Sequence, residues 1–272
     1  MFSGVPSVKL NTGMAMPVIG LGTWQAKGAP VVQAVKDALE IGYRHIDTAF
    51  VYQNEKEVGE GLRQQIAAGI VKREDVFINT KVWPKESPNH EKALRSIHRS
   101  LKMLNVTYLD LVLVHRPEEN YSDVYKGLEE AYKQKLVRSI GISNFNPSQI
   151  DHLMKTAKVK PAVNQINIHP TLNQDKTVEH CNKLGIQVTG YSPLATGKPV
   201  GLRSFKLINN PTLTAIGKKH NKTAAQVAIR WQIQRGIVTI PKSINKSHIK
   251  ENFNVFDFKL TQDEMKTINA VR

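Results

Sequence analysis

Apolar residues along this chain follow two spacings that alternate. Short, nearly continuous apolar runs such as residues 109–114 are typical of strands buried on both faces, as parallel strands are. Between these runs lie segments such as 31–41, whose apolar residues stand three and four positions apart, as in an amphipathic helix. The alternation of strand and helix patterns predicts a parallel sheet with helical crossovers.

Eight strands are predicted, at residues 19–24, 44–47, 76–80, 109–114, 139–142, 162–167, 187–190 and 237–240. Helices are predicted at 31–41, 55–67, 90–104, 122–134, 147–156, 174–184, 211–220, 223–234, 247–252 and 261–269. Segments 8–10 and 14–18 flank a Gly-containing turn and predict a hairpin that caps the barrel bottom. The pattern predicts an α/β fold, a (β/α)8 TIM barrel with an N-terminal β-hairpin cap; an open doubly wound sheet is the alternative.

Length and composition point to one barrel. The 272 residues suit a barrel of about 250 residues, and no linker-like stretch divides them, so one domain is expected over residues 1–272. No apolar run is long enough to cross a bilayer, no signal-peptide pattern opens the chain, and the single Cys181 cannot form an internal disulfide. We expect a cytoplasmic monomer without a membrane partner.

The formal net charge of +15 raises the question of an anionic partner. The basic residues are scattered along the whole chain, and no zinc-finger, RNA-binding or basic-zipper pattern occurs. The charge therefore predicts a solvated basic surface, or one that attracts an anionic cofactor, and no nucleic-acid partner.

Three ionisable residues stand at the ends of consecutive early strands. Asp47 ends the second predicted strand, Lys81 follows the third and His115 follows the fourth, with 34 residues from 47 to 81 and 34 from 81 to 115. Parallel barrels build their active sites at these strand ends, so the equal spacing predicts three side chains at one level of one face. Tyr52 leaves the first of these loops and can reach over them.

Together these groups are suited to protonating an oxygen. A phenol with a pKa of about 10 is a poor acid at neutral pH. Lys81 is expected to stabilise the Tyr52 phenolate and lower its pKa, Asp47 to hold the lysine charged, and His115 to orient a carbonyl oxygen or relay the proton. Taken singly, each residue is more often structural: a packing tyrosine, a turn aspartate, a solvated lysine or a strand-end histidine.

Other chemistries lack their motifs. The chain has no His-Glu-x-x-His motif or Cys cluster, so no metal site is expected, and no Gly-x-Ser-x-Gly elbow for acyl transfer. The negative charge on the oxygen must then come from another attacking species, and a nicotinamide hydride is the obvious one.

Ordered motifs over nearly the whole chain resemble those of the aldo-keto reductase family, in particular its short microbial-type members. The motifs are Gly42-Tyr43-Arg44-His45-Ile46-Asp47-Thr48-Ala49, Tyr52-Gln53-Asn54-Glu55, Thr80-Lys81-Val82-Trp83, Ser143-Asn144-Phe145, Asn164-Gln165, Tyr191-Ser192-Pro193-Leu194 and Ile240-Pro241-Lys242-Ser243. The resemblance implies an eight-stranded barrel that binds NADP(H) without a Rossmann fold, in keeping with the lack of a Gly-x-Gly-x-x-Gly loop.

The resemblance also implies residue roles. Tyr52 would be the general acid, Asp47 and Lys81 its tuning pair, and His115 the group that orients the carbonyl. The cofactor contacts implied are Gly22, Thr23, Trp24, Asp47, Ser143, Asn144, Gln165, Tyr191, Ser192, Leu194, Lys242, Ser243, His248, Glu251 and Asn252. Among them, Ser143, Asn144 and Gln165 would bind the nicotinamide carboxamide, Tyr191 would stack on the ring, Lys242 and Ser243 would meet the 2′-phosphate, and Glu251 and Asn252 would lie near the adenine. The substrate would be bordered by Trp24, Phe50, Tyr52, Trp83, His115 and Arg116.

Two positions depart from the family pattern. His248 stands where arginine is common, which predicts weaker selectivity for NADPH, with NAD(H) as a weaker alternative cofactor. Arg116 stands where the motif usually has tryptophan. It either favours carboxylate- or phosphate-bearing substrates or points to solvent.

The combined reading is an NADPH-dependent enzyme that reduces small aldehydes and ketones to alcohols. The chain ends soon after the last predicted helix, so we expect a more open pocket than in longer relatives and broad activity. Two alternatives remain: a non-catalytic NADP(H)-binding regulatory barrel, and a cofactor-free barrel enzyme such as an isomerase.

Overall fold

Eight parallel strands form the centre of the molecule in the computed structural model, which describes residues 4–195 and 207–271. The strands are β3 (Leu21–Gly22), β4 (His45–Asp47), β5 (Phe77–Val82), β6 (Leu111–Val114), β7 (Ile140–Ser143), β8 (Val163–Asn167), β9 (Gln187–Tyr191) and β10 (Val238–Ile240). Each strand pairs with the next along the chain. The first and last strands also meet, through bridges Ile19↔Thr239 and Gly22↔Lys242, so the sheet closes on itself. The predicted (β/α)8 barrel is confirmed.

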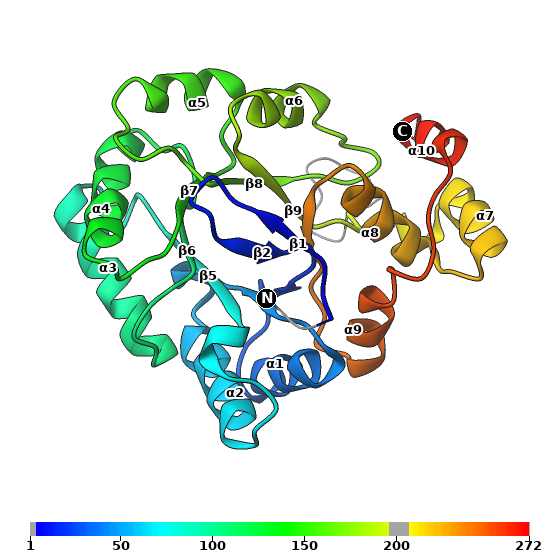
Figure 1. The fold of residues 1–272 in the computed structure, drawn as a ribbon, viewed down its shortest axis with the longest axis horizontal. Helices are drawn as coiled ribbons and strands as arrows, with labels where there is room; N and C mark the ends of the chain where they lie inside the picture. The colour runs from blue at the N-terminus through cyan, green and yellow to red at the C-terminus, as the bar shows by residue number, and fades with distance from the viewer. Residues whose placement is uncertain (1–3, 196–206, 272) are drawn as a thin grey trace.

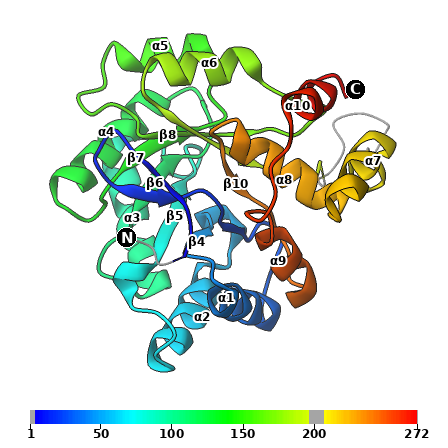
Figure 2. The same ribbon diagram turned by 45° about the vertical axis from the view of Figure 1, so that its right-hand side comes forward.

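Helices surround the strands, as Figures 1 and 2 show. They are α1 (Ala29–Ile41), α2 (Glu55–Ala67), α3 (His90–Leu104), α4 (Tyr121–Lys133), α5 (Pro147–Met154), α6 (Asp175–Lys183), α7 (Pro211–His220), α8 (Ala224–Gln234), α9 (Lys246–Phe253) and α10 (Gln262–Asn269). Short 3-10 turns occur at η1 (Phe50–Tyr52), η2 (Arg73–Asp75) and η3 (Leu207–Asn209). No helix among the described residues is long and apolar enough to cross a membrane.

The N-terminal hairpin closes one end of the barrel. Strands β1 (Ser7–Lys9) and β2 (Ala15–Pro17) pair antiparallel and lie across the ring of strands in Figure 1. Asn11 Nδ2 donates a hydrogen bond of 2.9 Å to the carbonyl of Pro161, which precedes β8, so the turn is held at the amino ends of the strands. The predicted cap is confirmed, and it leaves the carboxyl ends open for a site.

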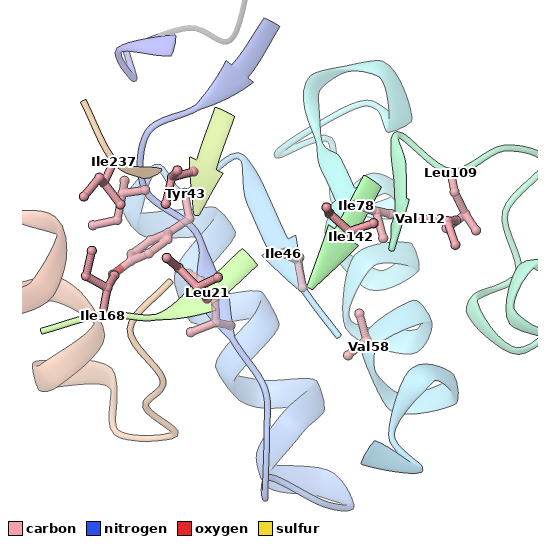
Figure 3. Close-up of a cluster of buried hydrophobic side chains, with 14 of the residues drawn as sticks. Leu21, Tyr43, Ile46, Val58, Ile78, Leu109, Val112, Ile142, Ile168 and Ile237 are labelled. Atoms are coloured by element: carbon pink, nitrogen blue, oxygen red, sulfur yellow. The ribbon is translucent and has the colours of Figure 1, made fainter. Parts of the chain in front are cut away.

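Two apolar cores follow from the alternation of side chains along each strand. On β6, Val112 and Val114 face outward and join the core under the helices, which Figure 3 shows for Val112 together with Val58 of α2. The alternate residues of β6, Leu111 and Leu113, face inward and pack with side chains of the hairpin. This inner core contains Leu10, Met16, Phe77, Leu111, Leu113, Ala162, Val163 and Val238. The barrel interior near the hairpin is therefore mainly apolar, with the buried pair His45 and Asn79 as a polar contact within it.

The predicted element bounds lie within two residues of the observed ones, and one shift matters for the chemistry. The third strand was expected to end at residue 80, but β5 continues to Val82 because Lys81 and Val82 pair with Leu113 and Val114 of β6. Lys81 is thus a strand residue and not the start of a loop. Its backbone is fixed by hydrogen-bonded neighbours, which holds its side chain in one direction.

Candidate active site

Asp47, Lys81 and His115 lie on the inner face of the barrel at the carboxyl ends of β4, β5 and β6. Asp47 pairs in register with Asn79, and Lys81 pairs with Leu113. Lys81 is therefore two residues further along its strand than the partner of Asp47, and His115 is two residues further along than the partner of Lys81. The sequence predicted all three at one level, and the structure corrects this. Because side chains alternate between faces, an even offset keeps all three on the same face.

Lys81 is the centre of a buried cluster of polar groups. Its Nζ lies 2.8 Å and 2.9 Å from the two carboxylate oxygens of Asp47, 3.0 Å from the carbonyl of Thr48 and 3.1 Å from the Tyr52 hydroxyl. Lys81 is 1% exposed and Asp47 is 3% exposed. A lysine is almost never buried without a partner, and here the carboxylate supplies it.

Burial sets the pKa values of the cluster. It lowers the pKa of Lys81, and the Asp47 carboxylate opposes that change. Burial raises the pKa of the Tyr52 hydroxyl well above 10, Asp47 and Tyr191 act in the same direction, and the Arg116 cation opposes them. This is the opposite of the direction expected from the sequence, because the charge of Asp47 offsets that of Lys81 and a buried phenolate is poorly solvated. Tyr52 therefore keeps its proton at neutral pH.

His115 carries no charge at neutral pH. Burial lowers its pKa to about 2, and the nearby cations Lys81 and Arg116 act in the same direction. Its ring packs edge-on against Trp83, with centroids 4.8 Å apart, and lies 5.9 Å from the Tyr52 ring. A neutral imidazole in this place can donate or accept one hydrogen bond, but it does not store an extra proton.

The next three strands add amides and a phenol to the same cluster. Gln165 on β8 donates from Nε2 to Asp47 Oδ1 over 2.9 Å, and Ser143 on β7 donates to the carbonyl of Gln165. Asn144 donates from Nδ2 to the carbonyl of His115, and its Oδ1 accepts from the Tyr191 hydroxyl of β9 at 2.8 Å. The backbone of Asn144 is left-handed (φ 65°), a conformation that asparagine tolerates better than most residues. These residues therefore form one hydrogen-bonded network.

The remaining predicted cofactor residues lie near the place where the barrel closes. They belong to β3 and the loop after it, to the loops after β9 and β10, and to α9. Thr23 Oγ1 donates to the carbonyl of Asp47, whereas the Trp24 side chain is 42% exposed. Gly22 has no room for a side chain, because a Cβ there would meet the Ile240 carbonyl at 2.7 Å. Ser192 has a left-handed backbone (φ 51°) and follows β9 directly, and Leu194 lies two residues further along.

The loop after β10 and the first turns of α9 carry exposed groups. Lys242 and His248 are exposed, and Lys242 forms no ion pair with any described carboxylate. Ser243 Oγ accepts from the amide of Asn245 at 3.0 Å. Two residues of α9 are already engaged within the protein: the Glu251 carboxylate accepts from Thr223 Oγ1, and Asn252 is 4% exposed.

The predicted substrate residues are less buried than the cluster beneath them. Arg116 is exposed, its guanidinium carbon lies 5.6 Å from the centre of the Trp83 ring, and its charge lowers the pKa of both Tyr52 and Tyr191. Phe50 lies under the guanidinium of Arg99, 3.5 Å from its ring centre. Arg116 therefore reaches solvent while its field extends into the cluster.

Asn54 is a positioning residue to which the sequence assigned no role. Its Nδ2 donates to the carbonyls of Thr23 and Ala26, and its Oδ1 accepts from Thr48 Oγ1 at 2.7 Å. Asparagine before a helix usually caps it, but this side chain makes no cap hydrogen bond to α2. It fastens the turn that carries Tyr52 to the β3 loop. The signal that could have found it was its place in the motif that contains Tyr52.

Comparison with known proteins shows the family to which the chain belongs. The model of the Aldo/keto reductase family matches residues 18–272. The chain belongs to the aldo/keto reductase family. Two aldo/keto reductase relatives are a 9,11-endoperoxide prostaglandin H2 reductase of Trypanosoma cruzi, 47% identical over 97% of this chain and 90% of the relative, and a glyoxal reductase of Bacillus subtilis, 42% identical over 97% and 92%.

Solved aldo/keto reductase structures share the whole barrel. The enzyme of Bombyx mori in complex with NADP has a TM-score of 0.88 and 40% identity, covering 97% of this chain and 92% of that one. An aldo-keto reductase from a deep-sea metagenome library has a TM-score of 0.91 and 43% identity, covering 96% and 93%. The eight strands of this chain therefore form the barrel known in the family and not an open sheet.

Proposed function

We propose that this protein is an NADPH-dependent carbonyl reductase that converts aldehydes and ketones to alcohols. The observation that carries the proposal is the contact of the buried Lys81 ammonium with both the Asp47 carboxylate and the Tyr52 hydroxyl. Membership of the aldo/keto reductase family and the NADP complex of the Bombyx mori neighbour support it. That the chain acts as a single domain and as a cytoplasmic monomer stays a prediction.

The residues at the mouth of the barrel fit a nicotinamide dinucleotide. Ser143, Asn144 and Gln165 offer a hydroxyl and two amides close together, which can pair with a carboxamide and fix the orientation of its ring. Tyr191 offers an aromatic face next to them. Lys242, exposed and without an ion pair among the described residues, suits a phosphate. When bound, NADPH would supply a hydride to the carbonyl carbon.

The buried cluster then handles the proton. The Tyr52 hydroxyl holds its proton at neutral pH and gives it to the carbonyl oxygen as negative charge develops there. Lys81, 3.1 Å away, stabilises the phenolate that remains until solvent reprotonates it. Neutral His115 donates a hydrogen bond that orients the carbonyl oxygen, which suits it better than the proton relay also considered from the sequence.

The non-catalytic regulatory barrel is the second function considered, and the completeness of the cluster argues against it. A barrel that only binds the cofactor gains nothing from a buried ammonium and carboxylate, because a buried ion pair adds little net stability compared with apolar residues. The neutral His115 and protonated Tyr52 are likewise poised for proton donation, which binding alone does not use.

NADPH oxidation with a panel of aldehydes, measured for the wild type and for Tyr52→Phe, tests the proposal. We expect the variant to lose about 10²–10⁴-fold in kcat, the usual contribution of a general acid. Quenching of tryptophan fluorescence by NADPH serves as the control that the variant still binds the cofactor. Equal rates would remove Tyr52 from the mechanism, and no quenching in the wild type would remove the cofactor.

A further inference from the structure

A basic cavity lies outside the candidate active site, beside α3. Its volume is about 230 Å³. Pockets for drug-sized ligands measure about 300–1,000 Å³, and a water molecule takes about 30 Å³, so this cavity suits a small ion or a small organic group. The lining comes from the loop after β5 and from the first three turns of α3: Glu86, Ser87, Lys92, Arg95, Ser96 and Arg99. None of these residues belongs to the predicted cofactor or substrate sites.

The charge of the lining is unbalanced. Lys92, Arg95 and Arg99 are spaced three and four residues apart, so they share one face of α3, where like charges repel. None of them forms an ion pair with a carboxylate in the described ranges, and Glu86 is the one carboxylate in the lining. The buried Glu55 carboxylate lies in the field of Arg99 and offsets part of this repulsion, and an anion in the cavity would offset more of it.

Ser96 supplies a second and independent sign of a ligand. Ser96 is 7% exposed, and its Oγ is buried without a hydrogen-bond partner among the described residues. A helical serine commonly donates to the carbonyl four residues earlier, but this one does not. A buried hydroxyl without a partner is destabilising, and a ligand oxygen in the cavity would supply the acceptor.

Arg99 is already held at the edge of the cavity. Its guanidinium carbon lies 3.5 Å from the centre of the Phe50 ring, a cation–π contact that limits the motion of a long side chain. A side chain fixed in this way loses less freedom when it binds a ligand.

We propose that this cavity binds a small phosphate-bearing anion. A phosphate group has enough acceptor oxygens for two guanidinium groups, one ammonium and one hydroxyl, whereas a carboxylate has only two oxygens. The site is separate from the proposed cofactor site and does not depend on the reductase proposal.

Calorimetric titration with inorganic pyrophosphate at low salt tests the proposal, using protein saturated with NADP⁺ so that the proposed cofactor site is filled. We expect Lys92→Ala/Arg95→Ala to weaken binding at least about tenfold, since it removes two charge-assisted contacts. The matched control, Lys218→Ala/Lys219→Ala, removes two exposed cations of α7 and is expected to change binding less than about twofold. Ser96→Ala should weaken binding about threefold or more while the protein stays folded.

The cavity is not a phosphate site if the wild type does not bind pyrophosphate, or if the control variant loses as much affinity as the cavity variant. In the second case the cations would attract anions only as part of a diffuse basic surface. Failure of NADP⁺ to bind would contradict the reductase proposal instead. In that case, titration without NADP⁺ would still show whether the cavity variant binds pyrophosphate more weakly than the control variant does.

Discussion

The mouth of the barrel has two sides that are built differently. On the β4–β6 side, Lys81 and Asp47 are almost fully buried and bonded to each other. On the β10–α9 side, Lys242 and His248 are exposed. Buried charges are expensive to leave unpaired, so a change on the first side affects both stability and chemistry. A change on the second side is expected to affect cofactor affinity alone, because exposed charges contribute little to stability.

Lys81→Met should give the largest effect, because it leaves the Asp47 carboxylate buried without its cation. We expect stability to fall by about 3–5 kcal/mol, measured by urea unfolding, and carbonyl reduction to be lost. In the double variant Lys81→Met/Asp47→Asn, no unpaired charge remains, so stability should recover while activity does not. If Lys81→Met is as stable as the wild type, the two sides do not differ as described.

His115 should make the protein sensitive to acid. Its pKa is about 2 in the folded protein and about 6.5 when unfolded, so below pH 6.5 the unfolded chain binds a proton that the folded one does not. This contribution therefore lowers stability as the pH falls, by about 2–3 kcal/mol at pH 4.5.

Replacing the histidine isolates this contribution. The stability of His115→Gln and of the wild type is measured by urea unfolding at pH 7 and at pH 4.5. We expect the loss of stability between the two pH values to be about 2–3 kcal/mol smaller in the variant. An equal loss in the two proteins would mean that His115 is not held neutral by burial.

Lys242→Ala tests the exposed side. Because only NADPH carries the 2′-phosphate, we expect KM for NADPH to rise about tenfold, KM for NADH to stay the same, and stability to be unchanged. With His248 in place of an arginine, the wild-type preference for NADPH in kcat/KM should stay below about 1,000-fold. A larger preference, or a variant that loses both cofactors equally, would contradict this assignment.

Strand periodicity predicted the parallel strands and their helical crossovers, because buried strands and amphipathic helices leave clear patterns, but it left an open doubly wound sheet as the alternative to the barrel. The spacing of Asp47, Lys81 and His115 was enough to bring them together, because an even offset between parallel strands keeps side chains on one face. The pKa of Tyr52 was not predictable, since it depends on how deeply the hydroxyl is buried and on the partner of Lys81.

Two other features could not be predicted from the sequence, because they depend on contacts between segments that are distant along the chain. The role of Asn54 was not predictable, because the carbonyls that its side chain contacts lie 31 and 28 residues away in sequence. The scattered basic residues predicted a solvated basic surface, and their pattern gave no sign of the cavity beside α3. Only packing shows that Ser96 is buried beside them without a partner.

Arg116→Trp is expected to have the smallest effect, because this cation is exposed and screened by salt although it lies on the buried side. Its field reaches Tyr52 and His115, so a substrate that carries a carboxylate should be favoured near the carbonyl site. We expect the ratio of kcat/KM for acidic over neutral aldehydes to fall about fivefold in the variant at low salt. Arg116→Lys, which keeps the charge, should retain the ratio. If the ratio is the same in the wild type and both variants, Arg116 does not select substrates and is only a solvent-exposed cation. The β4–β6 side would then contribute to catalysis but not to substrate selection.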